Sequence, residues 1–299
     1  MNDSNRINHW IDLHTHTDRS DGTLSPEELV VHAYKKGIST LSITDHDTVA
    51  GIKAATSYRD EKDIPINIIE GIELSAKSAK GILHILGYHI DINHQPLLDG
   101  LEKVRTIRAR RNSQIVEKLS SLGIDIGLDD FKAVSKNNES PGRPHIARVL
   151  VDKNIVGSID QAFDEYLGKN KKAYVPKKLY TAEEAISLIH EAGGIAIVAH
   201  PGSLKREGDE FEAYLCSLVE RGLNGIEVFA PLHEKIQIDS YLELAKKYDL
   251  MISAGSDFHG TNKPSIELGI CTNGEKIDSS KISSSLLSTL HSTTQVAYR

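Results

Sequence analysis

Short apolar runs alternate with amphipathic segments along most of the chain, which is the pattern of βα units. Helical patterns over residues 25–37, 48–62 and 181–194 separate the strand-like runs. Seven runs predict strands: 10–17, 38–47, 66–74, 81–90, 195–200, 224–230 and 250–260. The third and fourth have only a short connection between them. We therefore expect an α/β fold, a distorted (β/α)7 TIM-like barrel, with a doubly wound open sheet as the alternative.

The helix over residues 25–37 carries its own start and stop signals. Ser25 is the expected N-cap and Pro26 the expected first helical residue. Glu28 completes a capping box with Ser25, and Gly37 ends the helix.

The alternation stops near residue 99 and resumes near residue 179. In between, residues 101–123 form a long helical pattern, followed by shorter ones at 143–154 and 158–168. We expect residues 1–98 and 179–299 to build the barrel, and residues 99–178 to form a helical insertion that covers the active site.

Charge is distributed unevenly between these two parts. The 299-residue chain has a net charge of −7, which argues against a protein that coats duplex nucleic acid. Residues 99–178 hold 16 Lys and Arg against 11 Asp and Glu, whereas the rest holds 19 against 31. A basic insertion in an acidic body indicates that the insertion meets an anion, although a solvated helix face is the more common explanation of a charge run.

The cysteine content and the lack of long apolar runs indicate where in the cell the protein works. The two cysteines, Cys216 and Cys271, cannot make a disulfide framework. No apolar run approaches the ~20 residues of a membrane helix, and the first ten residues do not resemble a signal peptide. We expect a cytoplasmic protein without a membrane partner. The sequence does not predict an oligomeric state.

Metal-binding residue types gather at or near the C-terminal ends of the predicted strands, where barrels build their active sites. His14 and His16 are two residues apart, so a strand would present both imidazoles on one face. A lone buried histidine is more often a hydrogen-bonded core residue, but histidines at successive strand ends have no such explanation. Residues of metal-ligand type at or after these strands are His14, His16, Asp21, Asp45, His46, Asp47, Glu73, His84, His200, Glu227, Asp257 and His259, of which about nine would be ligands.

Histidine and carboxylate without cysteine suit Zn²⁺, Mn²⁺ or Fe. Nine ligands are too many for one ion, so we expect two or three divalent metals and a bridging carboxylate. Such a pair clamps the attacking and leaving oxygens at phosphorus, and a metal-bound hydroxide would be the nucleophile. No covalent serine or cysteine nucleophile is then needed.

A set of motifs in fixed order gives the chain a family resemblance. They are DLHTHTDRSDGTLSPEEL, LSITDHDTVAG, GIELSA, HILGYHID, IVAHPG and GSDFHG. Together they resemble the PHP family, named for polymerase and histidinol phosphatase. Within it, PGRPHIARVLV resembles the insertion of bacterial 3′,5′-nucleoside-bisphosphate phosphatases, also described as RNase AM.

The resemblance implies the PHP barrel with a trinuclear metal site. One metal would take His14, His16, Glu73 and Asp257; a second would share Glu73 and take His84 and His200; a third would take Asp21, His46 and His259. Asp45 and Asp47 would orient the imidazoles. In the insertion, Arg143 and His145 would clamp the substrate. Roles for Arg108, Arg111, Glu227 and His233 are left open.

The expected function is a metal-dependent phosphoesterase that hydrolyses the 3′-phosphate of nucleoside 3′,5′-bisphosphates. Removal of nucleotides from the 5′ end of short 5′-phosphorylated oligonucleotides is a second expected activity. Two alternatives stay open: a phosphatase for histidinol phosphate or another small monoester, and a non-catalytic metal-binding module. The expected partner is thus a phosphorylated nucleotide or short oligonucleotide, without a stable duplex.

Overall fold

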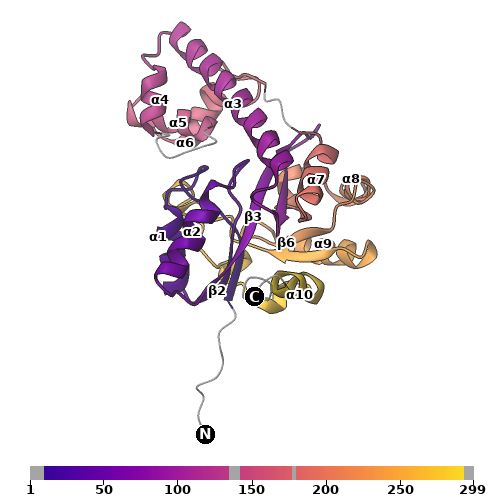
Figure 1. Cartoon of the computed structure of the whole chain (residues 1–299). Coiled ribbons are helices and arrows are strands. Elements are labelled where there is room, and N and C mark those ends of the chain that lie inside the picture. The colour runs from indigo at the N-terminus through magenta and orange to yellow at the C-terminus, as the bar shows by residue number, and fades with distance from the viewer. Residues whose placement is uncertain (1–9, 135–141, 177–179, 293–299) are drawn as a thin grey trace.

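Seven strands form one sheet in the order β1 to β7, in a computed structural model that describes residues 10–134, 142–176 and 180–292 (Figure 1). Each expected strand is present. The strands are β1 Trp10–Thr15, β2 Ile38–Ile43, β3 Asn67–Ala76, β4 Leu83–Tyr88, β5 Ile195–Val198, β6 Gly225–Phe229 and β7 Met251–Ala254.

The sheet closes on itself where the residues after β7 meet β1. His16 N donates to Phe258 O at 3.0 Å, and Asp257 N donates to His14 O at 2.9 Å. Closure removes the exposed sheet edges that an open sheet would leave. The barrel expectation is confirmed over the open-sheet alternative.

One strand departs from a regular βα barrel. β4 pairs antiparallel with β3, at Ile72 and Gly87, and antiparallel with β5, at Ile85 and Val198. Its N-terminal end therefore lies at the rim where the other strands have their C-terminal ends. This corrects the expectation that every ligand comes from a C-terminal strand end, since His84 is the second residue of β4.

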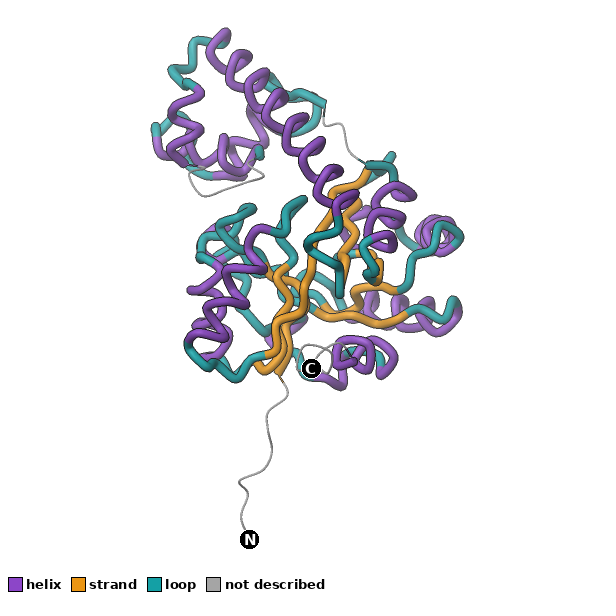
Figure 2. The backbone as a smooth tube through the Cα atoms, in the orientation of Figure 1, coloured by secondary structure: helices purple, strands orange, loops and turns teal. Residues whose placement is uncertain are grey.

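Helices surround the strands, as Figure 2 shows. The capping box of Ser25 and Glu28 begins α1 as the sequence predicts, and Gly37 follows its end with φ +78°. The barrel helices are α1 Pro26–Lys35, α2 Ala50–Glu61, α7 Ala182–Glu191, α8 Gly208–Val219, α9 Lys235–Lys247 and α10 Ser284–Ser292. Short 3₁₀ turns are η2 Pro201–Leu204, η3 Gly260–Asn262, η4 Thr272–Gly274 and η5 Ser279–Lys281.

The insertion is helical in its described residues and lies over one end of the barrel (Figures 1 and 2). It contains α3 Gln95–Ser121, α4 Leu128–Val134, α5 Arg143–Asp152, α6 Ile159–Ala162 and the π-turn η1 Phe163–Leu167. Its own apolar cluster includes Ile115, Leu119, Ile146 and Leu150.

Helix α3 belongs to both parts of the molecule. Leu97 and Leu101 pack in the barrel core, whereas Ile115 and Leu119 pack in the core of the insertion. The helix begins at Gln95 and runs through the boundary expected near residue 99. The second boundary, between residues 178 and 179, lies outside the described residues. α3 thus links the barrel and the insertion as one continuous helix.

A second apolar cluster joins β1, β3, β4 and β5 to α10, through Leu13, Ile69, Leu86, Ile197 and Leu286. In Figure 1, α10 lies at the end of the sheet opposite the insertion. The polar residues described next occupy the end that faces the insertion. None of the described helices is long and apolar enough to cross a membrane.

Candidate metal centre

Six histidines and three carboxylates meet at the rim of the barrel that faces the insertion. The imidazole rings lie side by side, with ring centroids 4.0 Å apart for His16 and His259 and 4.7 Å for His46 and His84. All nine expected ligands are in the cluster. They are His14 on β1, His16 and Asp21 after β1, His46 after β2, Glu73 on β3, His84 on β4, His200 after β5, and Asp257 and His259 after β7.

Glu73 is the hub of this cluster and is fully buried. Its Oε1 lies 2.9 Å from His84 Nδ1, 3.0 Å from His200 Nε2 and 3.5 Å from His14 Nε2. Its Oε2 lies 2.8 Å from His46 Nδ1 and 3.4 Å from His16 Nε2. A carboxylate in contact with five imidazoles has the geometry expected of a bridging ligand.

The other two carboxylates contact overlapping sets of imidazoles. Asp21 Oδ1 lies 3.2 Å from His259 Nε2 and 3.8 Å from His16 Nδ1. Asp257 Oδ1 lies 3.3 Å from His16 Nε2 and 3.5 Å from His14 Nε2. Three overlapping groups could each hold an ion: His14, His16 and Glu73; His46, Glu73 and His84; and His16, Asp21, His46 and His259.

These separations fit a metal site. Two ligands at the usual distance of about 2.1 Å from a tetrahedral ion lie roughly 3.4 Å apart. The buried Nε2 atoms of His14 and His16 have no hydrogen-bond partner among the described residues. Buried polar atoms of this kind are costly unless something binds them. The donor set of imidazole and carboxylate therefore fits divalent metal ions.

Charge interactions keep the carboxylates ionised. Burial alone would raise the pKa of Glu73, but His46, His84 and His14 outweigh it and hold the pKa well below its usual value. The same balance, with His46 and His259 as the cations, lowers the pKa of Asp21. Burial lowers the pKa of His84 to about 4. Ionised carboxylates and a neutral imidazole are the forms that bind metals.

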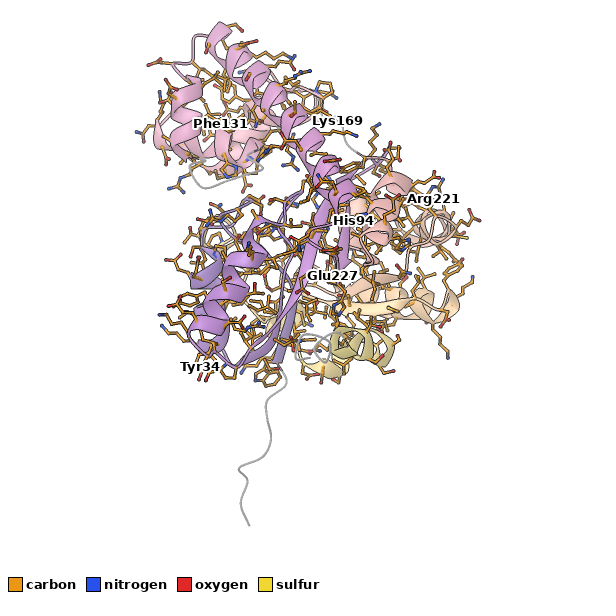
Figure 3. All side chains as sticks on the ribbon, in the orientation of Figure 1. Tyr34, His94, Phe131, Lys169, Arg221 and Glu227 are labelled. Atoms are coloured by element: carbon orange, nitrogen blue, oxygen red, sulfur yellow. The ribbon has the colours of Figure 1, made fainter. Side chains whose placement is uncertain are left out.

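Glu227, whose role the sequence left open, is a hydrogen-bond partner of the cluster. Its Oε1 lies 2.9 Å from His14 Nδ1, and its Oε2 accepts from His200 N at 2.5 Å. It is fully buried among the strands, where Figure 3 labels it. A carboxylate at Nδ1 leaves Nε2 of His14 as the atom that faces the cluster.

Asp45 and Asp47, expected to orient imidazoles, organise the loops around the cluster. Asp45 accepts from Thr17 Oγ1 at 2.6 Å and from Ser20 Oγ at 2.5 Å. Ser20 Oγ in turn lies 3.5 Å from His16 Nδ1, so the link from Asp45 to an imidazole is indirect. Asp47 accepts from Ser75 N at 2.8 Å and pairs with Arg108 of the insertion.

The backbone is unusual at three residues of the rim. Asp47, His200 and Asp257 have φ values of 52°, 24° and 54°. Left-handed conformations cost energy for residues other than glycine and concentrate at functional sites. Here they turn the chain in the loops that follow β2, β5 and β7.

The insertion adds a group of cations beside the cluster. Arg111 is buried, and burial together with the neighbouring Arg143 and Arg108 lowers its pKa to about 10. Its Nε donates to Val175 O at 2.9 Å, while its Nη2 has no hydrogen-bond partner in the described part of the chain. Arg143 Nη1 donates to Leu167 O at 3.0 Å. A buried guanidinium group with two half-buried arginines nearby, Arg143 and Arg108, is an arrangement expected of a site that binds an anion.

His145 lies between the insertion and the metal cluster. Burial lowers its pKa, and it interacts electrostatically with Asp21 of the cluster and with Arg108. Gly142 N donates to its Nδ1 at 3.3 Å, so the neutral ring carries its proton on Nε2. His145 therefore offers one N–H donor from the insertion.

Sequence reasoning missed Asp12 and Lys263. Asp12 accepts from Ser256 Oγ at 2.5 Å and from the backbone N of Ser256 and Gly269, which joins β1 to the loops after β7. Lys263 Nζ donates to Asp257 Oδ2 at 2.5 Å. In the sequence, only the nearness of these two residues to the ligand motifs could have indicated them.

The role of His233 was also left open by the sequence. Its Nδ1 lies 2.8 Å from Val228 O.

Comparisons with known proteins agree with this site. Residues 12–252 match the family model of the PHP domain. A 5′-3′ exoribonuclease of Haemophilus influenzae is 37% identical over 83% of this chain and 89% of its own length. A 3′,5′-nucleoside bisphosphate phosphatase of Chromobacterium violaceum is 32% identical over 87% of this chain and 90% of its own.

A solved structure of an amidohydrolase from Chromobacterium violaceum, with bound sulfate and no metal, superposes with a TM-score of 0.80. The two sequences are 31% identical, and the match covers 90% of this chain and 92% of the Chromobacterium chain. The family match, the relatives and the clustered histidines and carboxylates lead to one conclusion. This chain belongs to the PHP domain family and is a metal-dependent phosphoesterase that uses divalent metal ions.

Proposed function

We propose that this protein hydrolyses the 3′-phosphate of nucleoside 3′,5′-bisphosphates and also removes nucleotides from the 5′ end of short 5′-phosphorylated RNA. Both substrates carry one phosphate at the bond to be cleaved and a second one nearby. The relatives named as a bisphosphate phosphatase and a 5′-3′ exoribonuclease support both activities.

We assign the metal-ligand role to the nine clustered residues. Two or three divalent ions, Mn²⁺, Fe or Zn²⁺, would supply an activated water nucleophile and neutralise charge on the phosphoryl oxygens. Glu73 would serve as the shared ligand because both its oxygens contact imidazoles. Glu227 orients His14.

The observation that carries the substrate assignment is the buried Arg111 of the insertion, with the half-buried Arg143 and Arg108 beside it. Arg111 has a pKa depressed to about 10 by burial and by Arg143 and Arg108, and its Nη2 is buried without a hydrogen-bond partner in the described residues. A second phosphate would relieve this repulsion and supply acceptors for the guanidinium donors. The related Chromobacterium structure has bound sulfate, a tetrahedral anion like phosphate.

Two residues of the insertion connect its arginine group to the metal cluster of the barrel. Arg108, on α3, contacts Asp47 at the rim of the barrel, and His145, on α5, interacts with Asp21. The insertion therefore brings its cations to the edge of the metal centre. A nucleotide with two phosphates can reach both parts, whereas a simple monophosphate can use only one.

The test is phosphate release by Mn²⁺-loaded protein from adenosine 3′,5′-bisphosphate, with adenosine 3′-monophosphate as the matched monoester. We expect wild-type protein to prefer the bisphosphate and Arg143→Ala to lose that preference while it still cleaves the monoester. Arg148→Ala is the matched control, because Arg148 lies on the same helix and pairs with Asp152 at the surface. Equal loss on both substrates would refute the clamp.

The exonuclease activity needs its own comparison. A short oligoribonucleotide with a 5′-phosphate should be degraded from that end, and the same oligonucleotide with a 5′-hydroxyl should resist. If wild-type protein cleaves small monoesters as fast as bisphosphates and ignores both oligonucleotides, the protein is a general small-molecule phosphatase.

A further inference from the structure

Lys263 stands at the metal centre, although it is neither a candidate ligand nor part of the arginine group. It follows the turn η3, directly after the ligand residues Asp257 and His259. Its Nζ donates to Asp257 Oδ2 at 2.5 Å, and its charge also interacts with Asp21 and Glu73. An ammonium group thus contacts one carboxylate of the cluster and is near enough to interact electrostatically with the other two.

The two oxygens of Asp257 face different partners. Oδ1 lies 3.5 Å from His14 Nε2 and 3.3 Å from His16 Nε2. Oδ2 accepts from Lys263. A metal held by the histidines would therefore use Oδ1 and leave the bond from Lys263 in place. Carboxylate ligands are commonly hydrogen-bonded in this way through the second oxygen.

The loop does not depend on this ion pair for its conformation. Thr261 N donates to Thr23 Oγ1 at 3.0 Å, and Asn262 Nδ2 donates to Asp21 O at 2.8 Å. Lys263 N donates to Gly260 O at 3.3 Å. These bonds tie η3 to the loop after β1. The lysine side chain is thus delivered to the cluster by a backbone that other contacts hold.

The ammonium group can do more than hold Asp257. It has three donors, of which the bond to Oδ2 uses one. The Lys263 side chain is 42% exposed, so a ligand that enters the centre from solvent can reach it. An anion that enters the centre there would meet the ammonium group beside the Oδ2 atom of Asp257. Phosphoryl oxygens are the anionic acceptors that the centre receives during catalysis.

We propose that Lys263 is a phosphate-binding residue at the metal centre, which keeps Oδ2 of Asp257 and donates a second hydrogen bond to the phosphoryl group under attack. This inference rests on the proposed function, and it adds a cation on the barrel side to those of the insertion. Lysine acts here as a point charge rather than a fork, which suits a phosphoryl group whose geometry changes during the reaction.

The experiment uses the full chain and inorganic phosphate as the probe. Binding of phosphate to Mn²⁺-saturated protein is measured by calorimetry for wild type, Lys263→Met and Lys263→Arg. Mn²⁺ affinity is measured separately for each. Lys36→Met is the matched control, since Lys36 forms an exposed pair with Glu267 at 3.0 Å.

We expect Lys263→Met to weaken phosphate binding by about tenfold, which corresponds to about 1.4 kcal/mol. Lys263→Arg should recover most of the loss, and Lys36→Met should bind phosphate as wild type does. Phosphate affinity that is unchanged in Lys263→Met at saturating Mn²⁺ would overturn the proposal. The proposal also fails if Lys263→Met binds phosphate weakly only at low Mn²⁺ concentration. Lys263 would then act only through the affinity of the protein for the metal.

The outcome is separable from that of the proposed function. If wild-type protein fails to hydrolyse bisphosphates but binds phosphate through Lys263, the substrate assignment fails and the inference stands. If wild-type protein hydrolyses bisphosphates and Lys263→Met binds phosphate normally, the substrate assignment stands and the inference about Lys263 fails.

Discussion

The carboxylate of Glu227 and the imidazole of His14, 213 residues apart in the chain, lie 2.9 Å from each other in the buried floor of the metal centre. The second oxygen of Glu227 accepts from His200 N. One residue on β6 thus fixes an imidazole on β1 and the backbone after β5. Such outer partners set the orientation and basicity of metal ligands.

Replacement of Glu227 by Gln should therefore weaken metal binding without removal of a ligand. We expect Mn²⁺ affinity to fall by about 10- to 100-fold. Titration calorimetry of Glu227→Gln against wild type checks this, with Glu220→Gln at an exposed position as control. Wild-type affinity in Glu227→Gln would mean that Glu227 only fills space.

Gly255 is a position where any side chain should disturb His14. A Cβ at residue 255 would overlap the Cβ of His14 and lie 2.7 Å from its backbone N. We expect Gly255→Ala to lose metal affinity as well as stability, because β1 must shift. Thermal unfolding and Mn²⁺ titration measure the two effects. Gly127→Ala, with its nearest neighbour at 3.8 Å, should leave both unchanged.

Replacement of Arg111 should weaken substrate binding without a loss of folding stability. Its buried charge faces Arg143 and Arg108, so Arg111→Met removes repulsion and desolvation but also a hydrogen bond to Val175 O. We expect stability to be unchanged or to rise by about 1 kcal/mol, while KM for the bisphosphate increases at least tenfold. Melting temperature and kinetics are the measurements. A large loss of stability would show that Arg111 is a structural residue.

Asp12 should make stability depend on pH. Burial raises its pKa from 3.8 to about 6, despite hydrogen bonds from Ser256. The folded protein thus retains a proton that the unfolded chain releases, so this contribution to stability is present below pH 4 and is lost as pH rises through 6. It amounts to roughly 3 kcal/mol, at 1.36 kcal/mol per pKa unit.

Urea unfolding in chelator between pH 4 and 7 tests this linkage. The stability of wild type relative to Asp12→Asn should fall with rising pH across that window. A relative stability that rises with pH would contradict it, since the pKa of Asp12 would then be lowered in the folded protein.

Metal removal should affect stability as well as activity. The clustered carboxylates Asp21, Glu73 and Asp257 repel one another, and a ligand that binds only the folded state stabilises it. We expect chelation to abolish hydrolysis and lower the melting temperature, with Mn²⁺ restoring both. Hydrolysis that persists after metal analysis finds no bound metal would contradict metal dependence.

Local pattern was enough to predict the elements of this fold. The capping box of Ser25 and Glu28 and the seven apolar runs report interactions between near neighbours in the chain, and each has its counterpart in the structure. The change of pattern near residue 99 does not coincide with an element boundary, because α3 begins at Gln95 and continues to Ser121. The ligand types could also be predicted, because strand ends with histidine and carboxylate recur in a fixed order. That order carried the resemblance to the PHP family, which the family model matches.

Tertiary structure decided what depends on closure of the barrel. The antiparallel direction of β4 brings His84 to the shared rim from the other end of its strand, and no periodicity records strand direction. The partners Glu227 of His14 and Lys263 of Asp257 follow from contacts between separate strands and loops. The position of Arg108 and Arg111 beside the centre depends on how α3 leaves the barrel. These relationships join residues across the closed sheet or between barrel and insertion, so they arise only when the chain folds.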